Sequence, residues 1–551
     1  MATAGVLLLA GCTGAPAHSE KLPTKTTSPA APVTVIADGD QAGMALKASQ
    51  ELFARAPVVV VAPEDDPTTQ DLAARGAVAL GVPLLLGAAG DPEASAAPSP
   101  GQNADLVAEL ARLDAKAVIL VGGVARLPSD LKGSPKVIWV EATPSALGSA
   151  IGKPVSAPST LGTADFAAEI AALTPGNGLS GEQDESGSPA PSAPADSAVP
   201  IVERAKPLDD TLALVVDAPG QLAAIATARA AGVAVHLIAA EDANPQASSS
   251  VIKTLHESKA AKIMAIGPAF GEQDDLDWKI RSARTGYELP GGGQLLFPSH
   301  LFVALYGTPG APVMGVLGEQ DADGAVKRAE AMADDYRKLT DKTVVPMFEI
   351  IATVASATAG RDGNYSTEIP PEKLRPWIDK AADEGIYVLL DLQPGRTDFL
   401  TQAKEYQELL ELPNVGLALD PEWRLLPHQV HLVQIGSVTA KEINSVSSWL
   451  AELVNEKGLP PKMFVLHQFQ LRMIKDRQDV VTTHPELATL IHVDGQGSQP
   501  AKQETWRVLH RDAPEGVAWG WKNFYDEDSP MLTPEQTMSQ VKPEPDLVTY
   551  Q

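Results

Sequence analysis

The chain has 551 residues, a single cysteine and a formal net charge of -27 at pH 7. One cysteine excludes a disulfide within the chain, and the length predicts about two to four domains of ordinary size. The acidic balance disfavours nucleic acids and anionic headgroups as partners, because both would be repelled by the surface.

The N-terminal segment carries one motif. Cys12 closes the run Leu8-Leu9-Ala10-Gly11-Cys12 after a short apolar stretch. This run resembles the lipobox of bacterial lipoprotein signal peptides, in which the cysteine is acylated and the preceding peptide is removed. The resemblance predicts a signal peptide over residues 1–12 and lipidation of Cys12, which would hold the protein in the lipid bilayer at the extracytoplasmic face of the cell membrane. No later stretch is apolar enough to span a bilayer.

Two segments have the composition of linkers. Residues 13–32 are rich in Ser, Thr, Pro, Ala and Lys, and they are predicted to form a flexible tether. Residues 176–207 contain a low-complexity run of Gly, Ser, Pro and acidic residues. Neither segment has enough apolar surface to form a core, so both are interpreted as connections between domains.

Two α/β modules are predicted, over residues 33–175 and 208–298. In each, short continuous apolar strands alternate with Ala-rich helices, a pattern typical of parallel β-α-β units buried on both faces. The similar order of elements indicates a duplication. The predicted strands are 57–62, 81–86 and 117–123 in the first module, and 211–216, 232–238 and 262–267 in the second.

The strands at 81–86 and 117–124 carry a family resemblance. They are similar to the type 2 cell-wall-binding repeat of Gram-positive surface proteins, which implies tandem Rossmann-like modules that bind a wall polymer. The second copy differs, since Gly267-Pro268 stands where the first has Gly122-Gly123. A phosphate cradle at Gly122-Gly123 is the alternative, but neither common nucleotide-binding glycine pattern occurs there, and a tight turn is favoured.

Residues 299–551 continue the strand–helix rhythm. About seven units predict a (β/α) barrel, complete or one strand short, with a doubly wound sheet as the alternative. The predicted strands are 301–306, 343–348, 386–391, 415–420, 463–467, 489–494 and 516–521.

Several of these strands end in a carboxylate, an imidazole or an amide. The ends of parallel barrel strands meet at one rim, where carboxylates from separate strands can supply the acid and the base or nucleophile of glycoside cleavage. The segment Asp420-Pro421-Glu422-Trp423 is the most distinctive of these ends. The alternative for each acid is a helix cap. The catalytic candidates are Glu349, Asp391, Asp420, Glu422 and Asp494.

A second group of polar and aromatic residues is predicted to bind substrate at the same rim: Gln393, Trp423, His467, Gln468, His492, Trp519 and Trp521. The tryptophans have a core position as their alternative. A metal site joining His467 and His492 to Asp391 or Asp494 is the weaker hypothesis, because no H-x-H or H-E-x-x-H spacing supports it. The prediction is therefore no metal and no cofactor.

These observations predict a lipid-anchored envelope protein that binds a cell-wall polymer or envelope glycan and acts on it through its C-terminal barrel. The barrel resembles glycoside-hydrolase-like TIM barrels in architecture and in the placement of its acids. The alternative function is a non-catalytic scaffold whose barrel only recognises a saccharide or a partner.

Overall fold

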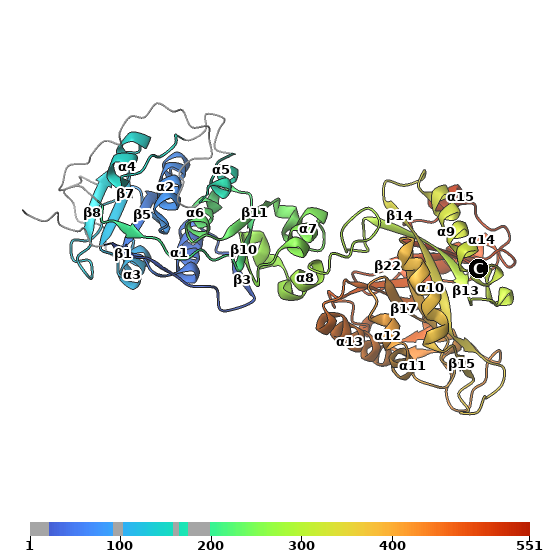
Figure 1. The fold of residues 1–551 in the computed structure, drawn as a ribbon. Helices are drawn as coiled ribbons and strands as arrows, with labels where there is room; N and C mark the ends of the chain where they lie inside the picture. Colours follow the sequence, from blue (N-terminus) through green and yellow to red (C-terminus); the bar gives the residue numbers. More distant parts are fainter. Residues whose placement is uncertain (1–20, 92–102, 158–164, 175–198) are drawn as a thin grey trace, which may run out of the picture. The chain divides into compact units, whose positions relative to one another are not determined.

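The computed structural model describes residues 21–91, 103–157, 165–174 and 199–551 (Figure 1). Cys12 and the predicted signal peptide lie outside these residues. The chain divides into two compact units, the first formed by Met1–Ala243 with Ser258–Gln273 and the second by Asn244–Glu257 with Asp274–Gln551. Among the helices that the structure describes, none has the length and hydropathy required to cross a bilayer.

The first unit contains a four-stranded parallel sheet in the order β6-β5-β7-β8. The inner strand β5 is wholly buried, which explains why it is a continuous apolar run. The strands are β5 (Val58–Pro63), β6 (Leu84–Gly87), β7 (Ala117–Val121) and β8 (Lys136–Val140). The helices are α1 (Gln41–Leu52), α2 (Pro67–Leu80), α3 (Ala104–Arg112), α4 (Pro144–Ile151) and α5 (Phe166–Ala172).

A second parallel sheet of the same unit has the order β11-β10-β12-β3. Its strands are β3 (Val33–Ile36), β10 (Thr211–Val216), β11 (Ala234–Ile238) and β12 (Lys262–Ile266), and α6 (Leu222–Ala230) follows β10. Strand β3, expected in the first module, pairs here with β12. Thr227 of α6 exchanges hydrogen bonds of 3.1 Å with both backbone groups of Leu84 in β6, so the two sheets share one hydrophobic core.

Parts of the predicted tether and linker form short strands. β1 (Leu22–Pro23) pairs with β9 (Val202–Glu203), and β2 (Lys25–Thr26) pairs with β4 (Phe53–Arg55). Backbone pairing therefore begins earlier in the chain than composition alone indicated. The assignment of the two sheets to a wall-binding repeat stays a prediction.

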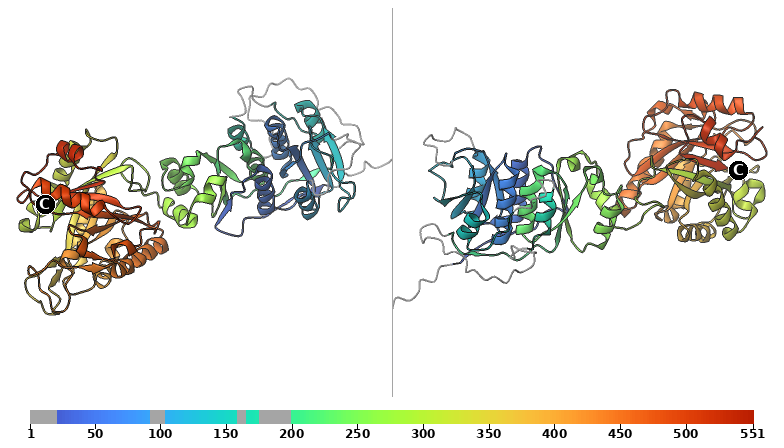
Figure 2. Two further views of the ribbon diagram at one scale, coloured as in Figure 1. Left: turned by 180° about the vertical axis from the view of Figure 1, so that it is seen from behind. Right: turned by 90° about the horizontal axis from the view of Figure 1, so that it is seen from above.

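The second unit is built on a closed barrel of eight parallel strands, which confirms the predicted barrel (Figures 1 and 2). It closes because β13 pairs with both β14 and β23. Seven of these strands match predicted ones, and β23 was not predicted. The strands are β13 (His300–Gly307), β14 (Thr343–Ala355), β16 (Tyr387–Leu392), β17 (Val415–Leu419), β19 (Lys462–His467), β21 (Leu487–Val493), β22 (Ala518–Asn523) and β23 (Leu547–Tyr550).

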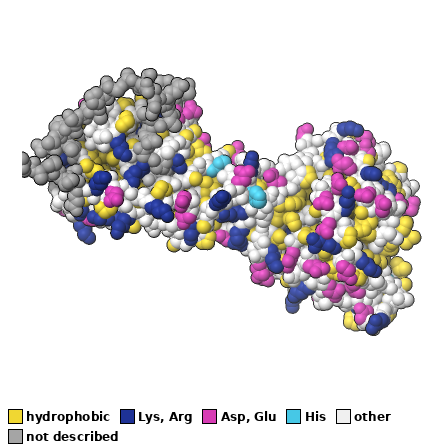
Figure 3. All heavy atoms as spheres, viewed as in Figure 1, with side chains coloured by type: hydrophobic (Ala, Val, Ile, Leu, Met, Phe, Trp, Pro, Cys, Tyr) yellow, Lys and Arg dark blue, Asp and Glu magenta, His cyan; other side chains and the backbone are white. Residues whose placement is uncertain are grey.

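Helices surround the barrel strands and bury their outward-facing apolar side chains (Figure 1). They are α9 (Ala322–Tyr336), α10 (Pro371–Asp383), α11 (Phe399–Glu405), α12 (Gln407–Leu410), α13 (Ala440–Lys457), α14 (Gln499–His510) and α15 (Pro534–Gln540). The unit also includes the helices α7 (Ser249–Glu257) and α8 (Leu276–Ala283) and the short strands β15 (Ser366–Glu368), β18 (Val438–Thr439) and β20 (Ile474–Lys475). Acidic and basic side chains are interspersed over the visible face of this unit rather than gathered in one patch (Figure 3).

Candidate active site

The barrel strands bring a set of polar side chains together inside the barrel, toward the carboxyl ends of the strands. In a parallel barrel these ends all lie on one side, so residues far apart in the sequence meet there. All of these side chains are buried. They are Tyr306 of β13, Glu349 of β14, Asp391 of β16, His467 of β19, His492 of β21, Lys522 of β22 and Thr549 of β23.

His467 bridges two carboxylates. Its Nε2 lies 2.8 Å from Glu349 Oε1, and its Nδ1 lies 3.0 Å from Asp494 Oδ2. Burial disfavours the charged imidazolium, but the neighbouring carboxylates of Asp391, Asp494 and Glu349 outweigh burial and raise the pKa of His467 well above its ordinary value. Burial would raise the pKa of Asp494, but the imidazole beside it lowers it instead.

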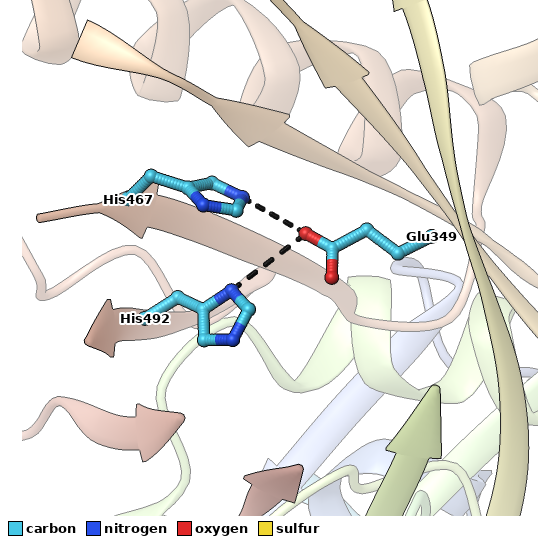
Figure 4. A group of neighbouring side chains, drawn as sticks. All are labelled: Glu349, His467 and His492. Atoms are coloured by element: carbon cyan, nitrogen blue, oxygen red, sulfur yellow. Dashed lines mark hydrogen bonds and ion pairs between the residues drawn. The ribbon is translucent and has the colours of Figure 1, made fainter. Parts of the chain in front are cut away.

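His492 faces the same glutamate from the next strand (Figure 4). Its Nδ1 lies 3.7 Å from Glu349 Oε1, and its Nε2 lies 2.7 Å from Thr549 Oγ1. Burial lowers the pKa of His492. The pKa of Glu349 is lowered although burial alone would raise it, because His492 and His467 both stabilise the carboxylate.

A second cluster joins Tyr306, Asp391 and Lys522. The phenol of Tyr306 donates to Asp391 Oδ2 at 2.9 Å, and Lys522 Nζ lies 3.4 Å from the centroid of the tyrosine ring. Burial raises the pKa of Asp391 to about 6. Gln393 Nε2 donates to the Tyr306 hydroxyl at 3.4 Å, which connects this cluster to the loop after β16.

A cleft of about 630 Å³ opens at this end of the barrel. Its polar lining includes Glu422 and Asp494, and five aromatic side chains contribute to its walls: Tyr306, Tyr365, Trp423, Phe469 and Phe524. Burial, and then the nearby charge of Asp494, raises the pKa of Glu422 to about 7. A cleft with buried acids and aromatic walls can hold a polar ring and transfer a proton to it.

Asp420 has a partly structural role. Its Oδ1 accepts a hydrogen bond from the backbone N–H of Glu422 at 3.3 Å, so it caps the short 3-10 turn Pro421–Trp423. This is the helix-cap alternative for this acid. The residue also lines the cleft, where burial and then the charge of Glu422 raise its pKa well above its ordinary value.

The structure separates the predicted site residues into three groups. Five line the cleft: Gln393, Asp420, Glu422, Trp423 and Asp494. Four are buried inside the barrel and are absent from the cleft lining: Glu349, Asp391, His467 and His492. Three lie elsewhere: Gln468, Trp519 and Trp521.

The two tryptophans of β22 point away from the barrel interior. Side chains alternate along a strand, and the interior positions belong to Gly520, which approaches the ring of His492, and to Lys522. Trp521 is fully buried and packs against Trp506 of α14, with ring centroids 5.6 Å apart. Trp519 stacks on His510, with ring centroids 3.5 Å apart. These positions favour the core alternative over the expected sugar contact.

Gln468 supports a loop. Its Oε1 accepts from Arg477 Nη1 at 3.2 Å, and its amide donates to the carbonyl of Gln470 at 3.2 Å. The backbone N–H of Gln468 also pairs with the carbonyl of His492 at 2.9 Å. The side chain therefore fixes the turn after β19 rather than facing the cleft.

Sequence reasoning missed three interior residues: Tyr306, Lys522 and Thr549. Lys522 lies one residue beyond the predicted strand 516–521, and the alternation of that strand, continued by one residue, was the available signal. Thr549 lies on the strand that was not found. Tyr306 ends a predicted strand, but a tyrosine there is ordinary in a buried strand.

Two sets of described residues place metal-ligand atoms within 4.8 Å of one another. One set is Glu349, His467 and His492, and the other is Asp420, His467 and Asp494. The imidazoles are brought together by the adjacent strands β19 and β21, not by a local spacing, which explains why no sequence motif indicated them.

Comparisons with known proteins give distant likenesses only. No protein-family model matches the sequence, and no curated protein sequence matches it. Among solved structures, the chain is similar to Cwp6 from Clostridium difficile, at 14% identity and a TM-score of 0.30, over 64% of this chain and 67% of that chain.

Two further solved structures are similarly remote in sequence. Cwp8 from Clostridium difficile is 13% identical with a TM-score of 0.18, over 77% of this chain and 52% of that one. The xylanase and alpha-amylase inhibitor protein XAIP-II from Scadoxus multiflorus is 13% identical with a TM-score of 0.29, over 45% of this chain and 92% of that one. At these values the likenesses carry no conclusion about activity.

Proposed function

We propose that the second unit hydrolyses a glycosidic bond in a cell-envelope glycan, with Glu422 as the proton donor and Asp494 as the second carboxylate. The observation that carries this proposal is that Glu422, with its pKa raised to about 7, lies in the same cleft as a second acid. Glycoside cleavage requires a carboxylic acid that still holds its proton near neutral pH, facing another carboxylate across the bond.

The walls of the cleft support a saccharide as the substrate. Aromatic rings stack on the apolar faces of sugars, and Trp423 and Tyr365 both line this cleft. The indole N–H of Trp423 is buried without a hydrogen-bond partner among the described residues, which leaves a donor for a substrate hydroxyl. The volume of about 630 Å³ is in the range of ligand pockets and suits a short glycan segment.

The envelope location rests on the sequence. The lipobox-like run at Cys12 and the repeat-like first unit support a protein anchored at the outer face of the membrane and attached to the wall. In this proposal the first unit holds the wall polymer, and the barrel acts on glycan within reach of the anchor.

The substitution Glu422→Gln tests the proton donor. The amide keeps the shape of the side chain but cannot donate the proton, so we expect sugar release from purified cell-wall fractions to fall by about 10²- to 10⁴-fold. Binding to the same fractions, measured by co-sedimentation, should be retained. In the wild type, release should decline as the pH rises through about 7, because Glu422 loses its proton there. Other charged groups surround it: Asp391, Asp420, His467, Asp494 and Lys522.

The matched control is Glu372→Gln, the same change at an exposed position in the first turn of α10. It should leave both release and binding unchanged. Full release by the Glu422→Gln protein would overturn the assignment of the donor. Binding of wall glycan without product from the wild type at any pH would overturn hydrolysis in favour of the non-catalytic scaffold.

A further inference from the structure

Three side chains from three barrel strands direct nitrogen and oxygen atoms at a common point. Glu349 Oε1 lies 2.8 Å from His467 Nε2 and 3.7 Å from His492 Nδ1 (Figure 4). In a tetrahedral zinc site with bonds of about 2.0–2.1 Å, neighbouring donor atoms are about 3.3 Å apart. The two separations lie on either side of that value, so a small adjustment of the side chains would place all three atoms around one ion.

Two buried atoms of this cluster lack a hydrogen-bond partner among the residues that the structure describes. They are Glu349 Oε2 and His492 Nδ1, and both side chains are fully buried. An unmade hydrogen bond in such a place is unfavourable, and more so when the group is charged. A bound cation would satisfy these atoms, since carboxylate oxygens and imidazole nitrogens are metal ligands.

The far nitrogen of each imidazole is held by another group. His467 Nδ1 contacts Asp494 Oδ2 at 3.0 Å, and His492 Nε2 contacts Thr549 Oγ1 at 2.7 Å. When an ion replaces the proton between His467 Nε2 and Glu349, the far nitrogens keep their protons, both contacts are hydrogen bonds, and the near nitrogens can direct their lone pairs at the ion. Metal-binding histidines are oriented in this way in known sites, often by a carboxylate.

We propose that Glu349, His467 and His492 form a binding site for one divalent transition-metal ion of the Zn²⁺ class, inside the barrel below the cleft. Two imidazoles and one carboxylate suit zinc, whereas Mg²⁺ and Ca²⁺ prefer sites made of oxygen atoms. Three protein ligands leave a fourth coordination position. The site reaches the cleft through Asp494, which lines the cleft and holds His467, so the ion would fix the position of that carboxylate.

The test is direct titration and does not depend on glycan hydrolysis. The full chain is stripped with a chelator and titrated with Zn²⁺ alone by calorimetry, and metal content is measured by mass spectrometry after dialysis. We expect one equivalent to be retained. Co²⁺ in its place should give the intense visible absorption of a low-symmetry nitrogen–oxygen site, a readout that requires no variant.

Variants identify the ligands. Glu349→Gln and His492→Gln should each weaken Zn²⁺ binding by more than about 100-fold, and Asp494→Asn, which removes only the negative charge of a supporting contact, by about 10- to 100-fold. His428→Gln changes an exposed histidine that is not part of the cleft lining and should bind as the wild type does. Circular dichroism confirms that each variant is folded, and if one ligand variant does not fold, the other decides.

Two results would overturn the proposal. The first is a folded wild-type chain that retains no Zn²⁺ and shows no Co²⁺ absorption, in which case His467 serves only to bridge Glu349 and Asp494. The second is binding that survives both ligand substitutions. Neither result bears on Glu422, so failure of the metal site is distinguishable from failure of the proposed hydrolysis.

Discussion

Lys462 lies at the start of β19, at the end of the barrel opposite the cleft, and is fully buried. Its ammonium donates to the carbonyl oxygens of Leu412 and Val415 at 2.7 and 2.8 Å. Burial lowers its pKa to about 7. The acceptors of Lys462 are backbone carbonyl oxygens and not a carboxylate, so its positive charge is poorly compensated. The free energy of unfolding should therefore depend on pH through this residue.

We expect Lys462→Met to remove part of the pH dependence of stability. Between about pH 7 and pH 10 the unfolded chain holds the lysine proton and the folded chain does not, so wild-type stability rises with pH across this window. Methionine carries no proton in either state. The difference in melting temperature between wild type and variant should therefore change in favour of the wild type from pH 7 to pH 9.5, measured by calorimetry.

A constant difference across that range would contradict the lowered pKa. The variant also leaves two buried carbonyl groups without their donor, at about 1–3 kcal/mol each, but this cost does not depend on pH. The slope of the melting-temperature difference against pH therefore reports the titration of Lys462 and not the change in packing.

The residue types at the strand ends indicated which residues lie near the candidate site. The sequence did not show which way each side chain points. Asp420, Glu422 and Asp494 were expected at the rim and line the cleft. Glu349 lies in the middle of the long strand β14, because this strand continues past the position where its apolar run appears to end. Whether a side chain faces the interior depends on which face of each strand the closed barrel encloses.

At the level of elements, an ion-pair cluster joins α2 to α5. Arg75 of α2 contacts Asp71 one turn earlier, with Nε 2.8 Å from Oδ2, and it also pairs with Glu169 of α5. The side chain of Asp71 is fully buried. Burial raises the pKa of Asp71, although Arg75 opposes the shift. The ion pairs of Arg75 hold α5 against α2.

We expect Arg75→Met to destabilise the first unit by about 3–5 kcal/mol, because it leaves the Asp71 carboxylate buried without its partner. The double variant Asp71→Leu with Arg75→Met should recover most of that loss, since both charges are then gone. Denaturant unfolding measures each free energy.

The control is Arg55→Met, which breaks a partly exposed pair with Asp114 and should cost no more than about 1 kcal/mol. Equal effects of the Arg75 and Arg55 substitutions would show that burial of Asp71 has no energetic consequence.

Elements were easier to locate than to pair. The apolar runs predicted at 57–62 and 211–216 correspond closely to β5 and β10. The pairing of these strands was harder to predict. Strand β3 pairs with β12 in the second sheet, and a strand of four residues has too little sequence pattern to indicate its partner. Strand β23 was missed for a similar reason, since four residues after a Pro-rich segment give little periodicity.

For the whole molecule, the two compact units have separate hydrophobic cores. We therefore expect thermal unfolding of the full chain to show two transitions rather than one. Arg75→Met should lower one of them and Lys462→Met should change the other, measured by differential scanning calorimetry. A single transition that both substitutions shift together would show that the units unfold as one.

The sequence by itself determined that the chain is α/β, because buried parallel strands must be continuous apolar runs separated by helices. It also determined which residue types lie at the strand ends. Only the tertiary structure decided that the barrel closes through β23, that Trp521 packs outside while Lys522 points inside, and that Glu349, His467 and His492 meet. The physical reason is that closure and strand order set these contacts, and both depend on backbone pairing between segments far apart in the chain.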